Sequence, residues 1–259
     1  MLGAIAGDVI GSVHEFKPPL AEDFELFTPK RHPTDDSVLT VAIAEAILER
    51  QPYAETLRRW AHRYPGAGYG MLFMGWMFTP GAGPYQSYGN GSAMRVSPAA
   101  WIHDTLEETL AEASRTAEVM HDHPEGIRGA QAVAGAIFIA RTCGSREAVH
   151  DLVHGRFGYD TMLTMERMRA ESIMDETCPG TVPQAASIAL MSTSVEDAIR
   201  KAVSLGGDAD TLGCIAGSIA EALHGGVPRR LADTVLAHLD KEMRAVVDRF
   251  MHRYGVPIG

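Results

Sequence analysis

The feature that most constrains the fold is a glycine turn that opens directly into an apolar helix in the C-terminal part of the chain. Residues 205–211 read Leu-Gly-Gly-Asp-Ala-Asp-Thr, and a largely apolar run follows at residues 212–223. Paired glycines permit a turn that bulkier residues cannot adopt. The turn places Asp208, Asp210 and the Thr211 hydroxyl at the mouth of a helix, where they form an oxygen-rich cluster.

A second stretch of the same character lies far upstream. Thr34-Asp35-Asp36-Ser37 directly precedes another apolar helical run, at residues 38–48. Helix capping explains either stretch alone, because aspartate and threonine are favoured caps and acids in a first turn are stabilised by the helix dipole. If the two stretches meet, two carboxylates about 4 Å apart repel by roughly 4 kcal/mol at an effective dielectric near 20. An all-oxygen cluster of this kind suits magnesium, manganese or calcium.

The first helix is predicted at residues 2–13 and carries glycines at every fourth position. Gly3, Gly7 and Gly11 share one face, where a neighbouring helix can approach closely. Asp8 interrupts this otherwise apolar helix. It is either a buried carboxylate bonded to a neighbouring helix end or a second-shell partner of the metal site, and the second interpretation is slightly favoured.

Most of the remaining chain has helical spacing. Helices are predicted at residues 53–63, 104–120, 129–141, 146–153, 161–169, 198–205 and 230–254, with capping pairs Asp104/Glu107 and Ser194/Asp197. No convincing period-two strand, repeat or low-complexity linker is found. The sequence therefore predicts one all-helical domain over residues 1–259, with sites built in its loops.

Three loop segments are candidates for ligand contact. Residues 66–91 combine glycines with aromatic rings, which suits either a packed loop or a wall on which a planar base could stack. Residues 89–95 lack the Walker and nucleophile-elbow patterns, but their backbone amides could face phosphate oxygens; an ordinary turn before a helix is the alternative. His121 and His123 form either a loop that caps a helix, a weak metal motif, or a contact to ribose or phosphate.

Composition excludes several classes of protein. The chain has 259 residues, is 46% hydrophobic, and has three isolated cysteines, so a core can form without disulfides and the thiols are expected to be reduced. A net charge of -10 without a basic run disfavours a bare nucleic-acid backbone as partner. No basic n-region opens the chain, and the apolar run at residues 132–140 is far shorter than the roughly 20 residues of a membrane span. A cytoplasmic protein with no membrane partner is expected.

Five motifs follow one another in the order seen in the ADP-ribosylglycohydrolases, which this sequence resembles from near residue 1 to about residue 226. They are Gly7-Asp8-Val9-Ile10-Gly11 with Glu15, Thr34-Asp35-Asp36-Ser37, Gly89-Asn90-Gly91-Ser92-Ala93-Met94-Arg95, His123-Pro124-Glu125-Gly126, and Gly206-Gly207-Asp208-Ala209-Asp210-Thr211. The resemblance implies a compact, all-α, single-domain orthogonal helical bundle. It also implies two Mg²⁺ ions, or sometimes Mn²⁺, at the base of an ADP-ribose cleft.

The resemblance assigns a role to each motif. One ion would be held by Thr34, Asp35 and Asp36, and the other by Asp208, Asp210 and Thr211, with Asp210 touching both. The pyrophosphate would be cradled by Gly89, Asn90, Gly91, Ser92, Ala93 and Met94, with His123 and Gly126 lining the same cleft. Glu15 and Asp36 are the two candidates for the catalytic carboxylate. Ser37 stands where the family usually has threonine, and Glu15 lies in a bacterial-type His-Glu-Phe variant.

The implied activity is magnesium-dependent hydrolysis of the N- or O-glycosidic bond between ADP-ribose and an acceptor. ADP-ribosylated arginine of a protein is the first expectation, and serine linkage, small conjugates such as O-acetyl-ADP-ribose, and modified nucleic acid stay open. One alternative is a catalytically silent ADP-ribose-binding protein, since a lens crystallin is among the relatives. Another is a structural calcium-binding protein, although no EF-hand spacing supports it. The intact set of Asp35, Asp36, Asp208 and Asp210 disfavours a silent protein.

Overall fold

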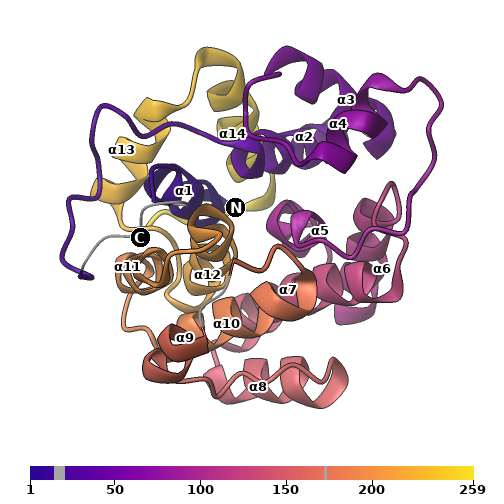
Figure 1. The fold of residues 1–259 in the computed structure, drawn as a ribbon. Helices are drawn as coiled ribbons and strands as arrows, with labels where there is room; N and C mark the ends of the chain where they lie inside the picture. Colours follow the sequence, from indigo (N-terminus) through magenta and orange to yellow (C-terminus); the bar gives the residue numbers. More distant parts are fainter. Residues whose placement is uncertain (15–20, 172–173) are drawn as a thin grey trace.

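The computed structural model describes residues 1–14, 21–171 and 174–259, and helices joined by loops make up this part of the chain (Figure 1). Its α-helices are α1 (Leu2–Gly11), α2 (Asp35–Glu49), α3 (Tyr53–Arg63), α4 (Met71–Phe78), α5 (Gly91–Met94), α6 (Leu106–Ala117), α7 (Pro124–Cys143), α8 (Arg146–His150), α9 (Met165–Glu171), α10 (Cys178–Met191), α11 (Val195–Leu205), α12 (Ala209–Leu223), α13 (Arg229–His238) and α14 (Lys241–Tyr254). A 3₁₀-helix, η1 (Ser97–Trp101), and a π-helix, η2 (Asp151–Arg156), complete the regular structure. Among the described residues, β pairing is limited to two isolated bridges, so the predicted all-α class is confirmed.

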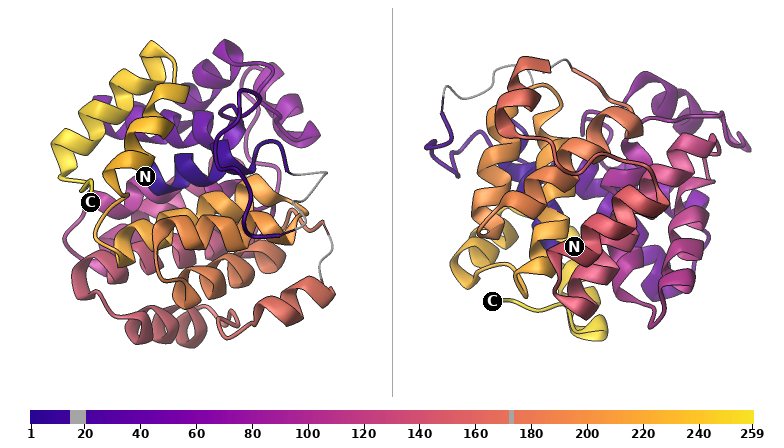
Figure 2. Two further views of the ribbon diagram at one scale, coloured as in Figure 1. Left: turned by 90° about the vertical axis from the view of Figure 1, so that its left-hand side faces the viewer. Right: turned by 90° about the horizontal axis from the view of Figure 1, so that it is seen from below.

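Helices α1 and α12 form the centre of the molecule. Every residue of α1 is buried, and α12 is buried along nearly its whole length. Figure 2 shows the indigo α1 enclosed between the yellow C-terminal helices and the orange helices. The two backbones touch, because a Cβ atom on Gly7 would overlap the main chain of Gly213, and one on Gly11 would overlap the main chain of Asp210. The predicted glycine face is therefore the contact that seats α1 against α12.

The remaining helices surround this pair in two groups. Helix α2 packs on α3 and α14, while α7 packs on α6, α10 and α12. Side-chain caps fix many of the helix starts; Ser194, for example, accepts a hydrogen bond from the Asp197 N–H at 3.0 Å, as the sequence predicts. Within the described residues, no helix combines the length and the apolar character that a membrane span requires.

Several sequence predictions differ from the structure, and the helix predicted at residues 161–169 begins only at Met165. The cap of α6 is Thr105, which accepts from the Glu108 N–H at 3.3 Å, so the predicted Asp104/Glu107 pair is wrong by one residue. The helix predicted at residues 230–254 is two helices. The first, α13, ends at His238, and Asp240 then caps the start of α14. The predicted loop at residues 66–91 contains α4. Helix α10 lies in a stretch for which no helix was expected.

Candidate metal centre and cleft

Asp8 ties the start of α2 to the middle of α1. Its Oδ2 accepts hydrogen bonds from the N–H groups of Thr34 and Ser37, each at 3.0 Å, and from the Ser37 hydroxyl. Its Oδ1 accepts from the Thr34 hydroxyl at 2.5 Å. A carboxylate at a helix N-terminus also interacts favourably with the helix dipole. Asp8 therefore holds the first turn of α2 in place, as one of the two sequence interpretations expected.

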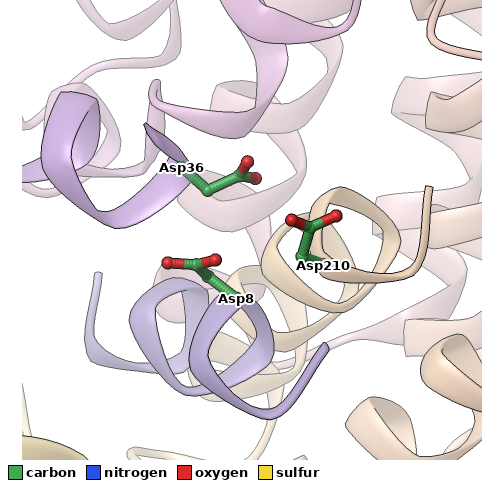
Figure 3. Close-up of side chains that lie close together, drawn as sticks. All are labelled: Asp8, Asp36 and Asp210. Atoms are coloured by element: carbon green, nitrogen blue, oxygen red, sulfur yellow. The ribbon is translucent and has the colours of Figure 1, made fainter. Parts of the chain in front are cut away.

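The two oxygen-rich stretches meet in space at this point. Asp8, Asp36 and Asp210 each present a carboxylate oxygen, and these oxygens lie within 4.8 Å of one another. Figure 3 shows the three side chains pointing toward a common space from α1, α2 and α12. The Thr211 hydroxyl donates to Asp36 Oδ2 at 3.2 Å, while the buried Asp36 Oδ1 has no hydrogen-bond partner among the described residues.

Burial and mutual repulsion make these carboxyl groups resist ionisation. The pKa of Asp8 is raised from 3.8 to about 7, first by burial and then by the charge of Asp210, against the hydrogen bonds from Ser37 and Thr34. The pKa values of Asp35, Asp36 and Asp208 are raised well above 3.8 for the same two reasons, burial first and Asp210 second. A cation placed among these groups would relieve both penalties.

The donor set suits a hard divalent cation. Buried carboxylate and hydroxyl oxygens converge here, and Asp36 Oδ1 is an orphaned polar atom that a bound ion would satisfy. Several of these oxygens are already engaged in hydrogen bonds. The Thr34 hydroxyl donates to Asp8, and Asp208 Oδ2 accepts from Asn90 Nδ2 at 2.6 Å. Asp8 retains a lone pair on Oδ1, which has a single hydrogen bond.

The cluster forms one end of a cleft of about 680 Å³. Six predicted residues at the cluster, namely Thr34, Asp35, Asp36, Asp208, Asp210 and Thr211, are part of its lining, and so are Gly89, Asn90, Gly91 and Met94 of the predicted pyrophosphate loop. Glu15 lies outside the described residues.

The other predicted substrate residues are not part of the cleft lining. Ser92 and Ala93 are buried, and the Ser92 hydroxyl donates to the Gly126 carbonyl at 2.7 Å. Gly126 has no space for a side chain, because a Cβ atom would lie 2.6 Å from the Ser87 carbonyl oxygen. His123 caps α7, accepting the Glu125 N–H through Nδ1 at 3.1 Å, and is not part of the cleft lining. These residues shape the wall of the cleft in this structure.

A buried cation borders the cleft and was absent from the predicted site. Arg95 is fully buried, donates to the carbonyls of Gly91 at 2.7 Å and Thr116 at 3.2 Å, and has no carboxylate partner among the described residues. Burial lowers its pKa to about 10, so it stays charged at neutral pH. One part of the cleft therefore carries a positive charge that has no ion-pair partner among the described residues.

His121, rather than His123, reaches the cleft. Its Nδ1 lies 3.4 Å from Arg95 Nη2, and because a guanidinium only donates, Nδ1 accepts and the ring proton sits on Nε2. Burial and the neighbouring Arg95 charge hold the pKa of His121 well below 6.5, so the ring is neutral. Its Nε2 lies beside Gly91, where it offers a donor to a ligand in the cleft. The sequence signal was the His-Asp-His pair itself, which does not distinguish the two rings.

Comparison with known proteins assigns the chain to a family. The family model described as ADP-ribosylglycohydrolase matches residues 1–257. The chain is 30% identical over 227 residues to an uncharacterized protein of Archaeoglobus fulgidus, which covers 76% of this chain and 73% of that protein. It is 25% identical over 288 residues to ADP-ribosylarginine hydrolase Tri1 of Pseudomonas putida, covering 96% of this chain and 77% of that protein.

Two further comparisons agree with this result. Chicken ADP-ribosylhydrolase ARH3 is 25% identical over 178 residues, a match that spans 54% of this chain and 48% of that protein. A solved structure described as an ADP-ribosylglycohydrolase-related protein complex superposes with a TM-score of 0.69 at 25% identity, covering 97% of this chain and 96% of that one. The protein thus belongs to the ADP-ribosylglycohydrolase family.

Proposed function

We propose that this protein is a magnesium-dependent hydrolase that cleaves the glycosidic bond between ADP-ribose and an acceptor, with the ADP-ribosylated arginine of a protein as the first substrate. The observation that carries the proposal is the convergence of Asp8, Asp36 and Asp210, because the last two line a cleft that Arg95 and His121 also border. ADP-ribose has a matching layout, with a ribose diol at the scissile end and an anionic pyrophosphate behind it.

Two divalent ions fit the oxygen donors that line the cleft. Thr34, Asp35 and Asp36 would hold one ion, and Asp208, Asp210 and Thr211 the other, with Asp8 close enough to contribute or to support the first group. Bound Mg²⁺ would supply positive charge that orients ribose hydroxyls and polarises a water molecule. Mn²⁺ accepts the same oxygen ligands.

The chain's own residues would then divide the work. Water adds to the anomeric carbon, the bond to the acceptor nitrogen or oxygen breaks, and the proton goes to that leaving atom. Asp36 offers an unpartnered carboxylate oxygen that can hold a water or carry a proton, and Glu15 is the second candidate for this role. Arg95, the Nε2–H of His121 and the Gly89–Gly91 backbone would hold the pyrophosphate.

The test is release of free ADP-ribose from a protein ADP-ribosylated on arginine, with Mg²⁺ and with a chelator. We expect metal-dependent release by the wild type, and loss of at least about a hundredfold in Asp210→Asn. Asp233→Asn is the matched control, because that aspartate is exposed and paired with Arg229 on the surface. Metal-independent release, or full activity in Asp210→Asn, would contradict the proposal. Binding of ADP-ribose without turnover of any ADP-ribosylated acceptor would favour the silent alternative.

A further inference from the structure

Helix α4 exposes an apolar face of unusual size for its length. Its sequence is Met-Leu-Phe-Met-Gly-Trp-Met-Phe, and the exposed fractions are 84% for Met71, 70% for Leu72, 37% for Met74 and 63% for Phe78. No polar side chain interrupts this face. Four large apolar side chains exposed on one short helix are more than the single scattered apolar residues that a folded surface normally carries. We call these four residues the α4 face.

The α4 face is held rigidly by the buried side of the helix. Trp76 lies under the Arg58 guanidinium, 3.7 Å from its ring centre, and Arg58 also donates to the Ala82 carbonyl at 2.7 Å. Phe73 stacks on Tyr69 with ring centres 4.9 Å apart. Because these contacts fix the helix in place, the exposed side chains form a surface that is already ordered before a partner binds.

The α4 face continues into the cleft at its metal-binding end. Met71 and Leu72 belong to both, since they also line the cleft beside Tyr69. The preceding turn passes close to the carboxylates, because a Cβ atom on Gly68 would lie 3.6 Å from Asp35 Oδ1. A group attached to a ribose held at the carboxylates would therefore pass out of the cleft along α4.

The size of the α4 face suits a transient contact. Eight helical residues extend for about 12 Å, so one face of the helix covers on the order of 200 Å². A stable dimer buries about 800 Å² on each partner, several times more than this. Methionine side chains adapt to differently shaped apolar partners, which suits a surface that must receive and release a substrate.

We propose that the α4 face docks the acceptor polypeptide of the substrate. The partner is a protein or peptide that presents apolar side chains next to its ADP-ribosylated residue, and small conjugates of ADP-ribose would not engage the surface. This inference rests on the proposed function, because it assigns the ribose to the carboxylates. It makes α4 a determinant of acceptor choice.

The experiment uses two synthetic peptides of about ten residues, each with one ADP-ribosylated arginine, flanked by leucine and phenylalanine in one and by serine in the other. Free ADP-ribosyl-arginine is the third substrate. We expect the wild type to favour the apolar peptide by at least tenfold in kcat/KM, about 1.4 kcal/mol. The double variant Met74→Ser/Phe78→Ser should lose this preference and keep wild-type turnover of free ADP-ribosyl-arginine, since neither residue lines the cleft. Met162→Ser, at a methionine that is 73% exposed and lies outside α4, is the control.

The results separate the two proposals. Equal turnover of both peptides by the wild type would overturn the docking role while leaving the hydrolase intact. Equal losses on all three substrates in the double variant would also overturn it, as would a dimer of the wild type that the double variant dissociates without any change in peptide preference. Failure of the wild type on every substrate would instead refute the proposed function, and the docking role with it.

Discussion

Replacing Asp36 by asparagine should stabilise the metal-free protein at neutral and alkaline pH. Asp36 is a buried carboxylate within 4.8 Å of the Asp8 and Asp210 oxygens, and its Oδ1 has no partner among the described residues. Without a cation, each charge in the group raises the free energy of the others. Asparagine nearly preserves the shape of the side chain and removes the charge, so the substitution isolates the electrostatic cost.

The magnitude follows from the geometry. One pair of charges 4.8 Å apart interacts by about 3 kcal/mol at an effective dielectric near 20. Burial first, and then the charge of Asp210, raise the pKa of Asp36. We therefore expect Asp36→Asn to raise the free energy of unfolding by about 3 kcal/mol at alkaline pH.

The free energy of unfolding depends on pH because the carboxyl groups have higher pKa values in the folded than in the unfolded chain. A carboxyl group whose pKa is raised on folding binds its proton more tightly in the folded than in the unfolded chain, so its contribution to stability is largest below 3.8. That contribution falls as the pH rises from 3.8 through the raised pKa of the folded state and then stays constant. The pKa of Asp36 is raised well above 3.8, so the difference between wild type and Asp36→Asn should be small near pH 4.5 and larger near pH 8.

Urea unfolding followed by circular dichroism, with a chelator present at both pH values, measures this difference. Asp233→Asn is the control, and as an exposed residue it should change the free energy of unfolding by less than about 0.5 kcal/mol. Mg²⁺ at 1,000 times its Kd should reverse the order, because it stabilises the wild type by about 4.1 kcal/mol, more than the gain expected from the substitution. A variant that is less stable than the wild type by the same amount at both pH values would refute the electrostatic reasoning.

Three further predictions concern packing and the cleft. Gly7→Ala should lower the free energy of unfolding by at least about 3 kcal/mol, because its Cβ would overlap the Gly213 main chain, whereas Gly75→Ala, with nothing within 4 Å, should raise it by about 0.5–1 kcal/mol. Thermal or urea unfolding checks both. Arg95→Met should weaken ADP-ribose binding at least tenfold by calorimetry, about 1.4 kcal/mol, and unchanged affinity would remove the cation from the binding site. Asn90→Ala should weaken Mg²⁺ binding about tenfold, since it removes the amide that orients Asp208 at 2.6 Å; unchanged affinity would argue against that role.

The sequence predicted the helices that begin with a recognisable capping residue. Ser194 caps α11 as expected, and the Thr34 stretch opens α2. Helix α4 was missed because it is apolar on every side and has no polar face to create a period of 3.6 residues. Helix α10 was missed because it begins with Pro179 and Gly180 and has Pro183 in its interior, and these residues usually mark turns.

The site depends on contacts that sequence spacing does not encode. The two oxygen-rich stretches were recognised separately, but the hydrogen bond from Thr211 to Asp36 joins residues 175 positions apart. The role of Asp8 as the anchor of α2 needed the same long-range information. Arg95 closes the Gly89 motif but was given no role, since an arginine after a loop is usually solvated, and its burial in the cleft wall is what identifies it as part of the site.

The backbone contact between α1 and α12 sets the distance between the carboxylates of the cluster. Asp8 is carried by one helix and Asp210 by the other, and Gly11 lies directly against the main chain of Asp210. A single methyl group inserted at this seam would push the two helices apart and widen the opening between their carboxylates. The space available to a cation between these carboxylates is therefore set by glycines at the contact of the two helices, which have no side chain.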